Sequence, residues 1–350
     1  MIEKYFIKND LQLKRWRRFK SHKTAVFSIW VLLISLFVTI TAEFWANSKP
    51  LYLNYKGKHY FPVFREYIRD YIPGIKPYHP KEMGITELLT IDYRRLNLSD
   101  DDAIIWPFVS WDPFESNIEP DMYPAPPSNS NLMGTDDRGR DVLTRLIYGM
   151  RYSFLYAILV WAITFIIGTI IGGVMGYYGG KFDFIGQRFI EVFSSVPQFF
   201  LLLIVISIFQ PSLAWLVVIS SLFGWILISY YMRGEFLKNR KREFVEAARS
   251  MGASQKRIIF GHILPNSLSP IITFTPFVIA GGIMGLASLD YLGFGLMPPT
   301  PSWGELLNQA QKYFTIAWWL AVFPSGFLFA TLVMLTLVGD GVRDAMDPNL

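Results

Sequence analysis

Five stretches of this 350-residue chain contain no Asp, Glu, Lys or Arg, and this absence restricts the fold more than any other feature. The charge-free stretches are residues 25–42, 152–180, 192–232, 263–289 and 313–339. A helix needs about 20 largely apolar residues to cross a bilayer, so each stretch is long enough to do so. The run 192–232 is too long for one crossing and is divided by Gln210-Pro211, so we expect six membrane-spanning helices.

The continuity of these runs predicts an all-α integral membrane protein. In hydrocarbon the backbone polar groups must be satisfied within the protein, so only helices and closed barrels cross a membrane. Strands of a barrel alternate apolar and polar residues, whereas these runs are apolar throughout. We expect residues 24–45 to form the first spanning helix. It is not a cleaved signal, because Glu43-Phe44-Trp45 follows the apolar core where a signal has small residues.

The distribution of Lys and Arg predicts which parts lie in the cytoplasm, where basic loops are enriched. The tail 1–23 contains eight of these residues and the segment 233–262 contains eight more. Four expected spans separate the two segments, so both lie inside and both termini are cytoplasmic. The insertion 46–145, with more acids than bases, then lies outside, and residues 146–350 form a five-helix core. The net charge of +5 reflects loops beside anionic lipid, not nucleic-acid binding.

The insertion carries several local signals. The segments 51–55 and 59–61, joined by Lys56-Gly57-Lys58, predict a β-hairpin. Residues 100–102 are three aspartates that we expect to start a short helix, and the proline-rich segment 120–127 predicts an extended tether. Two roles for the insertion stay open at this point: a structural cap, or a contact surface for a soluble substrate carrier.

A polar segment precedes the second expected span. It consists of Gly134, Thr135, Asp136, Asp137, Arg138, Gly139, Arg140 and Asp141. Thr135 or Asp136 is expected to cap a helix that lies on the outer face and leads into the span near Tyr152. The carboxylates and guanidinium groups are expected to pair with one another rather than to hold an anion or a metal.

Small residues and prolines predict how the spans pack. Glycines at 168, 172, 173 and 176 are spaced for close approach of another helix. Arg188 and Glu191 are expected to pair across one helical turn. The fifth span is the least regular and is the candidate wall of a translocation path, with simple kinking as the alternative. Its residues are Pro265, Pro270, Pro276, Gly281, Gly282 and Gly285.

The chain lacks the residue patterns of the common enzyme and metal sites. It has no cysteine, and its four histidines are scattered without zinc spacing. Neither a Gly-x-Ser-x-Gly elbow nor a phosphate-binding loop occurs in the sequence. We therefore expect no catalytic residue, no metal and no cofactor in this chain. If it transports actively, its energy comes from another protein or from an ion gradient.

The hydrophilic segment between the fourth and fifth spans predicts a docking element. Residues 243–251 form a helix in this interpretation, with a small apolar face made by Phe244, Ala247, Ala248 and Met251. Gly252 ends it with a left-handed cap, and Ser254 caps a second helix that carries Lys256 and Arg257. A connector lying on lipid is the alternative, although such a helix prefers larger apolar residues.

This segment also resembles a known family signature. Glu246-Ala247-Ala248, Gly252 and His262-x-Leu264-Pro265-Asn266 are similar to the "EAA" loop of ABC importer permeases. Three further segments resemble its oligopeptide, dipeptide and nickel branch: Gly134 to Asp141, Tyr291 to Gly304, and Gly339 to Pro348. The resemblance covers about residues 130–350 and the first span. Because Leu286 replaces a common glutamate and Asp290 follows four residues later, the chain looks most like the microcin C and oligopeptide subgroup.

The resemblance implies a type I importer permease fold. It also implies a second, homologous permease, two ATPase domains that bind ATP and magnesium, and an extracytoplasmic solute-binding protein. Within the cytoplasmic loop 233–264 it assigns coupling to the ATPase to Glu243, Glu246, Ala247, Ala248, Gly252, Ala253, Ser254 and Arg257. Asp290 is a candidate for the translocation path, with a local helix cap as the favoured alternative.

The expected function is therefore uptake of oligopeptides or peptide-like, microcin C-like compounds across the inner membrane by alternating access. The alternatives are a dipeptide or nickel importer, a transporter driven by an ion gradient, and a membrane scaffold that does not transport. A gradient-driven transporter needs ionisable relays within the spans or an inverted repeat, and the sequence shows neither clearly.

Overall fold

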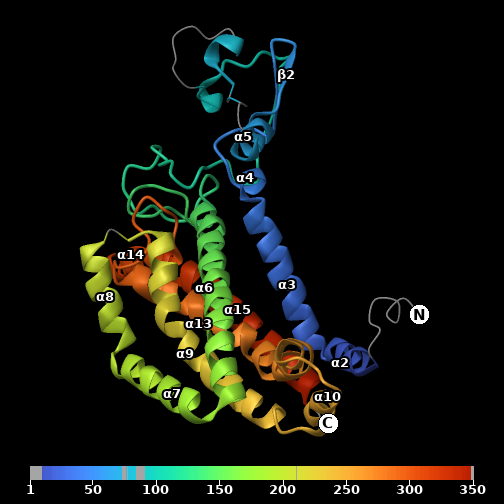
Figure 1. Cartoon of the computed structure of the whole chain (residues 1–350). Helices are drawn as coiled ribbons and strands as arrows, with labels where there is room; N and C mark the ends of the chain where they lie inside the picture. The colour runs from blue at the N-terminus through green and yellow to red at the C-terminus, as the bar shows by residue number, and fades with distance from the viewer. Residues whose placement is uncertain (1–9, 73–75, 77, 84–90, 210, 348–350) are drawn as a thin grey trace. The chain divides into compact units, whose positions relative to one another are not determined.

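The computed structural model describes residues 10–72, 76, 78–83, 91–209 and 211–347. Lys4, Lys8, Gln210 and Pro348, on which some expectations above depend, lie outside the described residues. The chain divides into two compact units. Unit 1 comprises Met1–Leu33, Tyr152–Met297 and Leu328–Leu350, and unit 2 comprises Ile34–Arg151 and Pro298–Phe327. Helices make up most of the described chain (Figure 1).

Within the part of the chain that the structure describes, five helices are long and apolar enough to cross a membrane. They are α3 (Lys23–Ile40), α6 (Val142–Tyr178), α9 (Leu213–Asn239), α13 (Ser269–Tyr291) and α15 (Trp318–Met346). They coincide with charge-free stretches of the sequence, so these expected spans are confirmed as helices. Only 22–50% of the residues in their apolar windows are buried within the chain, so each helix presents apolar side chains outward.

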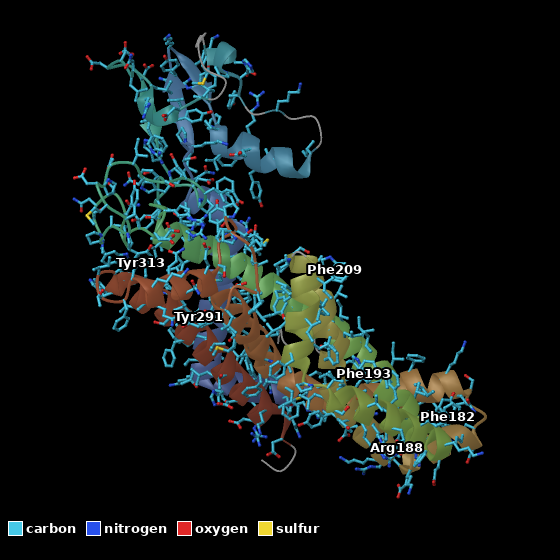
Figure 2. The ribbon with its side chains drawn as sticks, turned by 90° about the vertical axis from the view of Figure 1, so that its left-hand side faces the viewer. Phe182, Arg188, Phe193, Phe209, Tyr291 and Tyr313 are labelled. Atoms are coloured by element: carbon cyan, nitrogen blue, oxygen red, sulfur yellow. The ribbon has the colours of Figure 1, made fainter. Side chains whose placement is uncertain are left out.

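The remaining expected span falls on a bent pair of helices, α7 (Gly180–Ser195) and α8 (Gln198–Ile208), which has the geometry of a broken span or a re-entrant loop. The two parts meet at an angle of 70°. The charge-free residues 192–209 therefore do not form one continuous helix, because Pro197 lacks an N–H and disfavours helical geometry at Val196. Phe182, Arg188 and Phe193 follow one another along α7 (Figure 2). As expected, Arg188 pairs with Glu191, at 2.5 Å between Nη1 and Oε2.

Glycines hold α6 against α9 in unit 1. A Cβ added at Gly168 would lie 2.7 Å from the carbonyl oxygen of Trp225, and one at Gly176 would lie 2.6 Å from that of Arg233. Gly172 faces the backbone of α9 just as closely. Only glycine permits such backbone contact, so the close packing expected from the glycine spacing is confirmed.

The start of α6 differs from the expectation. Asp141, rather than Thr135 or Asp136, caps the helix, because its Oδ1 accepts a hydrogen bond from the Thr144 N–H at 2.7 Å. Residues 136–140 form a turn closed by the Asp136 N–H and the Arg140 carbonyl at 2.9 Å. No separate helix precedes the span, since α6 runs unbroken for 37 residues. At 1.5 Å per residue it is about 55 Å long, against about 30 Å for a hydrocarbon core.

Unit 2 contains a small antiparallel sheet in the order β2-β1-β3. Its strands are β1 (Tyr52–Tyr55), β2 (Lys58–Tyr60) and β3 (Ala103–Ile105), and Leu53 lies opposite both Tyr60 and Ile104. Lys56 and Gly57 have φ angles of 53° and 73°, as the tight turn requires. The predicted hairpin is thus confirmed. Leu53, Tyr55, Tyr60, Met83 and Tyr93 form its buried core.

Two expectations for the insertion were wrong. The aspartates at 100–102 do not start a helix, because the Asp102 carboxylate accepts hydrogen bonds from the N–H groups of Ser99 and Lys56 at 2.9 and 2.7 Å. These bonds direct the chain into β3. Nor is the segment 120–127 an extended tether: it bends around residues 119–124 and docks Ala125, whose N–H donates to the Thr135 hydroxyl at 2.8 Å.

Short elements complete the two units. They are α2 (Asp10–Ser21), α4 (Ala42–Trp45), α5 (Pro62–Tyr71), the 3₁₀ turns η1 (Pro80–Met83) and η2 (Tyr93–Arg95), and α14 (Trp303–Lys312). Before the fifth span lie α10 (Glu243–Ser250), α11 (Gln255–Arg257), the π-helix η3 (Ile258–Ile263) and α12 (Leu264–Ser267). The irregular backbone therefore precedes the span, and α13 itself continues through Pro276. Pro265 and Pro270 occupy first helical turns, where a missing N–H is tolerated.

Candidate functional site

The helix α10 forms the centre of the predicted coupling loop. It spans eight residues, in agreement with the sequence-based helix, and places Glu243 and Glu246 in its first turn. Carboxylates there interact favourably with the positive end of the helix dipole. The N-cap residue, Arg242, makes no side-chain capping hydrogen bond. The side chains that stabilise the start of the helix are therefore these two carboxylates.

Gly252 terminates α10 in the predicted left-handed conformation, with φ of 79°. Its N–H donates to the Arg249 carbonyl at 2.9 Å, and the Ala253 N–H donates to the Ala248 carbonyl at 3.0 Å. These two bonds are the Schellman pattern. The Ser254 hydroxyl then accepts from the Arg257 N–H at 3.4 Å, so the predicted cap of the second helix is confirmed. The chain therefore reverses direction over a fixed turn.

The packing of α10 corrects the predicted apolar face. Val245 and Ala248 are buried at 0% and 2% exposure, in one core cluster with Met232, Phe236, Ile258 and Ile263. Met251 is 81% exposed and Phe244 is 39% exposed, and Ala247 is also exposed. Ala248 thus belongs to the inner face and Val245 joins it, because helix α10 must pack on the π-helix that follows it. Phe244, Ala247 and Met251 remain as an uncovered face.

Polar contacts fix the loop to the helices on either side. The Asn239 amide at the end of α9 donates to the Ser267 hydroxyl in α12 at 3.0 Å, and both side chains are buried. The Asn266 amide donates to the His262 carbonyl at 2.7 Å and closes the end of the π-helix. The segment between α9 and α13 is therefore one packed body rather than a loose connector.

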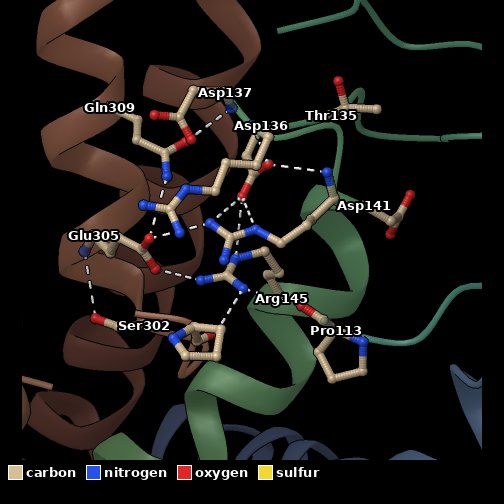
Figure 3. A network of polar contacts seen from close by, with 12 residues as sticks. Pro113, Thr135, Asp136, Asp137, Asp141, Arg145, Ser302, Glu305 and Gln309 are labelled. Atoms are coloured by element: carbon tan, nitrogen blue, oxygen red, sulfur yellow. Dashed lines mark hydrogen bonds and ion pairs between the residues drawn. The ribbon is translucent and has the colours of Figure 1, made fainter. Parts of the chain in front are cut away.

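A second group of predicted residues forms a buried ion-pair cluster in unit 2 (Figure 3). Arg140 Nε donates to Asp136 Oδ2 at 2.7 Å, and Arg140 Nη2 donates to Glu305 Oε1 at 3.1 Å. Arg145 pairs with the same two carboxylates, at 3.4 Å between its Nε and Asp136 Oδ2 and through Nη2 to Glu305 Oε2. The expected pairing within the segment is confirmed for Asp136 and Arg140. Arg145 and Glu305, the other members of the cluster, lie outside the predicted segment, and Asp141 binds Asn131 and Thr144 instead.

Backbone oxygens complete the surroundings of Arg145. Its Nη1 donates to the carbonyl oxygens of Pro113 and Pro299 at 3.0 and 3.1 Å, and its Nη2 donates to that of Thr300 at 3.3 Å. The side chain is 0% exposed, so these bonds replace its hydration. The cluster thereby joins the segment before α6 to the proline-rich segment before α14.

The other residues of the polar segment shape this junction. Gly134 has φ of 75°, and a Cβ there would lie 2.8 Å from the Ala125 carbonyl oxygen. The Thr135 carbonyl accepts from the Trp319 indole at 3.1 Å. Gly139 also has φ of 75°, within the turn that presents Arg140. Burial raises the pKa of the Asp141 carboxyl, and hydrogen bonds from Asn131 and Thr144 oppose this shift.

A cavity of about 440 Å³ lies along α13 in unit 1. Gly281, Gly282 and Gly285 line it, and Tyr156 and Ser220 contribute its polar groups, with a hydrogen bond of 2.7 Å between their hydroxyl oxygens. Pro270 lines a different hollow. Asp290 is 7% exposed, and its Oδ1 accepts a hydrogen bond from the Leu296 N–H at 2.6 Å, as a local cap would.

The sequence matches the family model described as the binding-protein-dependent transport system inner membrane component over residues 168–350. This chain belongs to that family of ABC transporter permeases. Residues 14–62 of the permease match the model of the N-terminal TM domain of oligopeptide transport permease C. The family consists of membrane components and not of catalytic enzymes, so the expectations of a multi-pass inner membrane permease, of a type I permease fold and of no enzyme activity are confirmed.

Similar proteins cover nearly the whole permease. It is 36% identical over 340 residues, 96% of each chain, to the Inner membrane ABC transporter permease protein YejE of Escherichia coli strain K12. It is 35% identical to the Peptidoglycan transport system permease protein YejE of Agrobacterium fabrum, over 96% of this chain and 92% of that protein. The Oligopeptide transport system permease protein OppC of Haemophilus influenzae is 36% identical over 63% of this chain and 70% of its own length.

Sequence reasoning missed several residues of the permease. Arg145 and Glu305 were not assigned to any site, although Glu305 follows the Pro-Pro-x-Pro-x-Trp-Gly segment directly. A charged residue within an apolar run, such as Arg145, was a signal that a buried partner should be sought. Among the described residues, no group of three or more His, Cys, Asp or Glu side chains could hold a metal ion.

Proposed function

We propose that this permease is one of two homologous membrane subunits of an ATP-driven importer for peptides or peptide-like compounds. The observation that carries this proposal is the uncovered face of α10, presented by a rigidly packed loop. Two ATPase domains in separate subunits would bind ATP and magnesium, and an extracytoplasmic solute-binding protein would deliver substrate. Both termini and α10 then lie in the cytoplasm, and the insertion 46–145 lies outside.

The chemistry of α10 favours a protein groove over lipid as its partner. Glu243, Glu246 and Ser250 are exposed on the helix and Arg249 is its one basic residue, whereas the polar face of a helix lying on a membrane is rich in Lys and Arg. Ala247 lies among these exposed polar residues and has a side chain of one methyl group. Phe244 and Met251 flank it and provide apolar anchors. A small residue between two anchors suits insertion into a cleft.

The packing of the loop gives such a partner a mechanical connection to the spans. Val245 and Ala248 lie in one cluster with Met232 and Phe236 of α9 and Ile271 of α13. Close-packed cores transmit displacement because they hold few voids. A push on α10 would therefore move the cytoplasmic ends of α9 and α13 together, and alternating access would follow from that movement.

Within this proposal, the cavity beside α13 is part of the translocation path. Gly281 and Gly285 have nothing within 4 Å of an added Cβ, so their side of the helix is open. The class of substrate follows from the relatives, whose names specify oligopeptide, dipeptide and peptidoglycan transport. We place this permease with the importers of oligopeptides and microcin C-like compounds.

The substitution Ala247→Trp tests the coupling role. The complex, reconstituted in vesicles with ATP and with the proton gradient collapsed, is assayed for peptide uptake. We expect wild-type uptake under these conditions and a loss of at least about tenfold in the variant, since a misfit of about 1.4 kcal/mol in a docked interface already has that effect. Ala214→Trp is the matched control, because Ala214 is also an exposed alanine and lies at the start of α9, away from α10 in the sequence.

Two outcomes would refute the proposal. Normal uptake by a stably inserted Ala247→Trp variant would show that α10 does not dock. Uptake that needs the proton gradient and ignores ATP would indicate a gradient-driven transporter instead. Co-purification of ATPase subunits with the wild type, and their loss in the variant, would support docking at this helix.

A further inference from the structure

The N-terminal helix α2 packs against the end of α15 in unit 1. Phe19 of α2 is buried with Ala25 and Ala345, and Arg18 Nη1 donates to the Asp347 carbonyl at 3.0 Å. The start of α3, the start of α13 and the end of α15 also belong to this region. Because three spanning helices begin or end here, the region lies at the level of a membrane surface.

One hollow in this region is polar and mainly basic. It has a volume of about 530 Å³, and its charged lining consists of Arg15, Lys238, Arg242, Arg343, Glu235 and Asp347. Lys238 lies 3.6 Å from Glu235, so this pair is neutral as a unit. Among the side chains that the structure describes, no acid lies within ion-pair distance of the other three cations. The hollow therefore has a positive potential that an anion would neutralise.

A second hollow adjoins the first and is apolar. It has a volume of about 630 Å³ and shares Arg15, Ser269 and Met346 with the basic hollow. Trp16, Ile29, Leu268, Ile272 and Val342 contribute its apolar walls. Trp16 is 42% exposed and Ile272 is 46% exposed, so no described residue of the chain covers the groove.

We propose that the two hollows together bind one anionic diacyl phospholipid. Its phosphate would lie in the basic hollow against the guanidinium groups of Arg15, Arg242 and Arg343. One acyl chain would lie in the apolar groove between α2, α13 and α15. A soluble phosphate compound would not need the groove. A zwitterionic lipid would not need the excess of positive charge in the hollow, where four basic residues face the two acids Glu235 and Asp347. Basic hollows beside the ends of spanning helices suit anionic headgroups.

This site adjoins the predicted coupling loop, because Arg242 directly precedes α10. The proposal does not depend on the proposed function, since lipid retention is measurable without transport. Phe244 of α10 also lines the basic hollow, but lipid retention and docking have separate readouts, so the failure of one proposal is distinguishable from the failure of the other.

The experiment uses the full-length permease, purified with its accompanying subunits in mild detergent and titrated with palmitoyl-oleoyl phosphatidylglycerol in native mass spectrometry. We expect Arg15→Gln to weaken binding about fivefold, because one basic residue contributes about that factor to attraction of an anionic headgroup. Lys14→Gln removes the same charge from the same helix but does not line either hollow, so it is the matched control. Ile272→Trp fills the groove and should weaken binding as well.

Two further compounds test whether the bound anion is a lipid headgroup or a soluble phosphate. Palmitoyl-oleoyl phosphatidylethanolamine should bind more weakly than phosphatidylglycerol, and glycerol 3-phosphate should not compete. Equal binding by Arg15→Gln and Lys14→Gln would overturn the proposal. Competition by glycerol 3-phosphate, with no effect of Ile272→Trp, would show a site for a soluble phosphate. A photo-crosslinking residue at position 272 that captures a polypeptide and no lipid would show a protein interface instead.

Discussion

The coupling loop and the ion-pair cluster are both rigid, but they differ in what they leave uncovered. In the cluster, Asp136, Arg140 and Arg145 are at most 3% exposed, and the charges are directed at one another. In the loop, Val245 and Ala248 are buried while Ala247 and Met251 face outward. Apolar side chains that stay exposed to solvent add nothing to the stability of the folded chain. The cluster joins segments of unit 2 through buried ion pairs, whereas the open face of the loop is the surface on which the proposed docking depends.

The largest expected effect comes from the cluster. Glu305→Gln leaves Arg140 and Arg145 with one carboxylate between them, and both guanidinium groups are at most 3% exposed. Removal of one partner from a buried pair lowers stability by on the order of 3–5 kcal/mol. We expect a marked drop in melting temperature in detergent.

The matched control for this prediction is Glu115→Gln. Glu115 pairs with Arg94 at side-chain exposures of 33% and 30%, so solvent screens the pair. Its loss should lower stability by at most about 1 kcal/mol. Equal effects of the two substitutions would contradict the stabilising role given to the cluster.

An intermediate effect is expected at two glycines that end helices in the same way. Gly252 and Gly293 have φ of 79° and 80°, and neither has an atom within 4 Å of an added Cβ. Alanine at either position should therefore lower stability by about 1–2 kcal/mol through backbone strain alone. Only Gly252→Ala should also lower ATP-driven uptake, because it displaces the end of α10. If Gly293→Ala lowers uptake equally, the special role of the loop is refuted.

The smallest effect concerns the pH dependence of stability. Burial, followed by the charge of Asp136, raises the pKa of Asp137 above its usual 3.8. The ionised carboxylate therefore lowers the stability of the folded state, and this loss sets in as the pH rises from 3.8 through the raised pKa. Asp137→Asn should remove that dependence and raise stability at neutral pH by well under about 1 kcal/mol, since solvent screens a half-exposed group. Thermal unfolding across pH 3–8 measures it.

The contribution of Asp102 to the pH dependence of stability has the opposite sign to that of Asp137. A hydrogen bond from the Ser99 backbone, with others from the Ser99 hydroxyl and the Lys56 backbone, lowers the pKa of its carboxyl below 3.8. This group adds stability that is present above pH 3.8 and is lost as the pH falls through the lowered pKa. Asp102→Asn should therefore destabilise the fold at neutral pH. The same sign in both variants would contradict this account.

The parts predicted well from the sequence depend on neighbours along the chain. Charge-free runs located the spans, Gly57 located the hairpin, and Gly252 and Ser254 located the ends of the coupling helices. Each of these signals acts within a few residues. They therefore do not depend on how the rest of the chain folds.

The parts that sequence reasoning missed depend on distant partners. Glu305 became part of the cluster only because the first turn of α14 lies against Arg145, 160 residues earlier. Asp102 was assigned to a helix because its bond to Lys56 across the sheet could not be foreseen. Val245 was overlooked since its burial requires the π-helix of residues 258–263, a rare geometry without a sequence signal.

The glycine contact between α6 and α9 limits where an opening movement can occur. Their backbones touch at Gly168, Gly172 and Gly176, so neither helix can slide or roll past the other without lifting away along its whole length. The two helices therefore behave as one rigid pair. Gly281 and Gly285 of α13 border empty space instead. Between these two positions Gly282 meets Ala157 of α6, with 3.1 Å between an added Cβ and the Ala157 Cβ, so α13 is held to α6 at one point while the positions on either side of it are open.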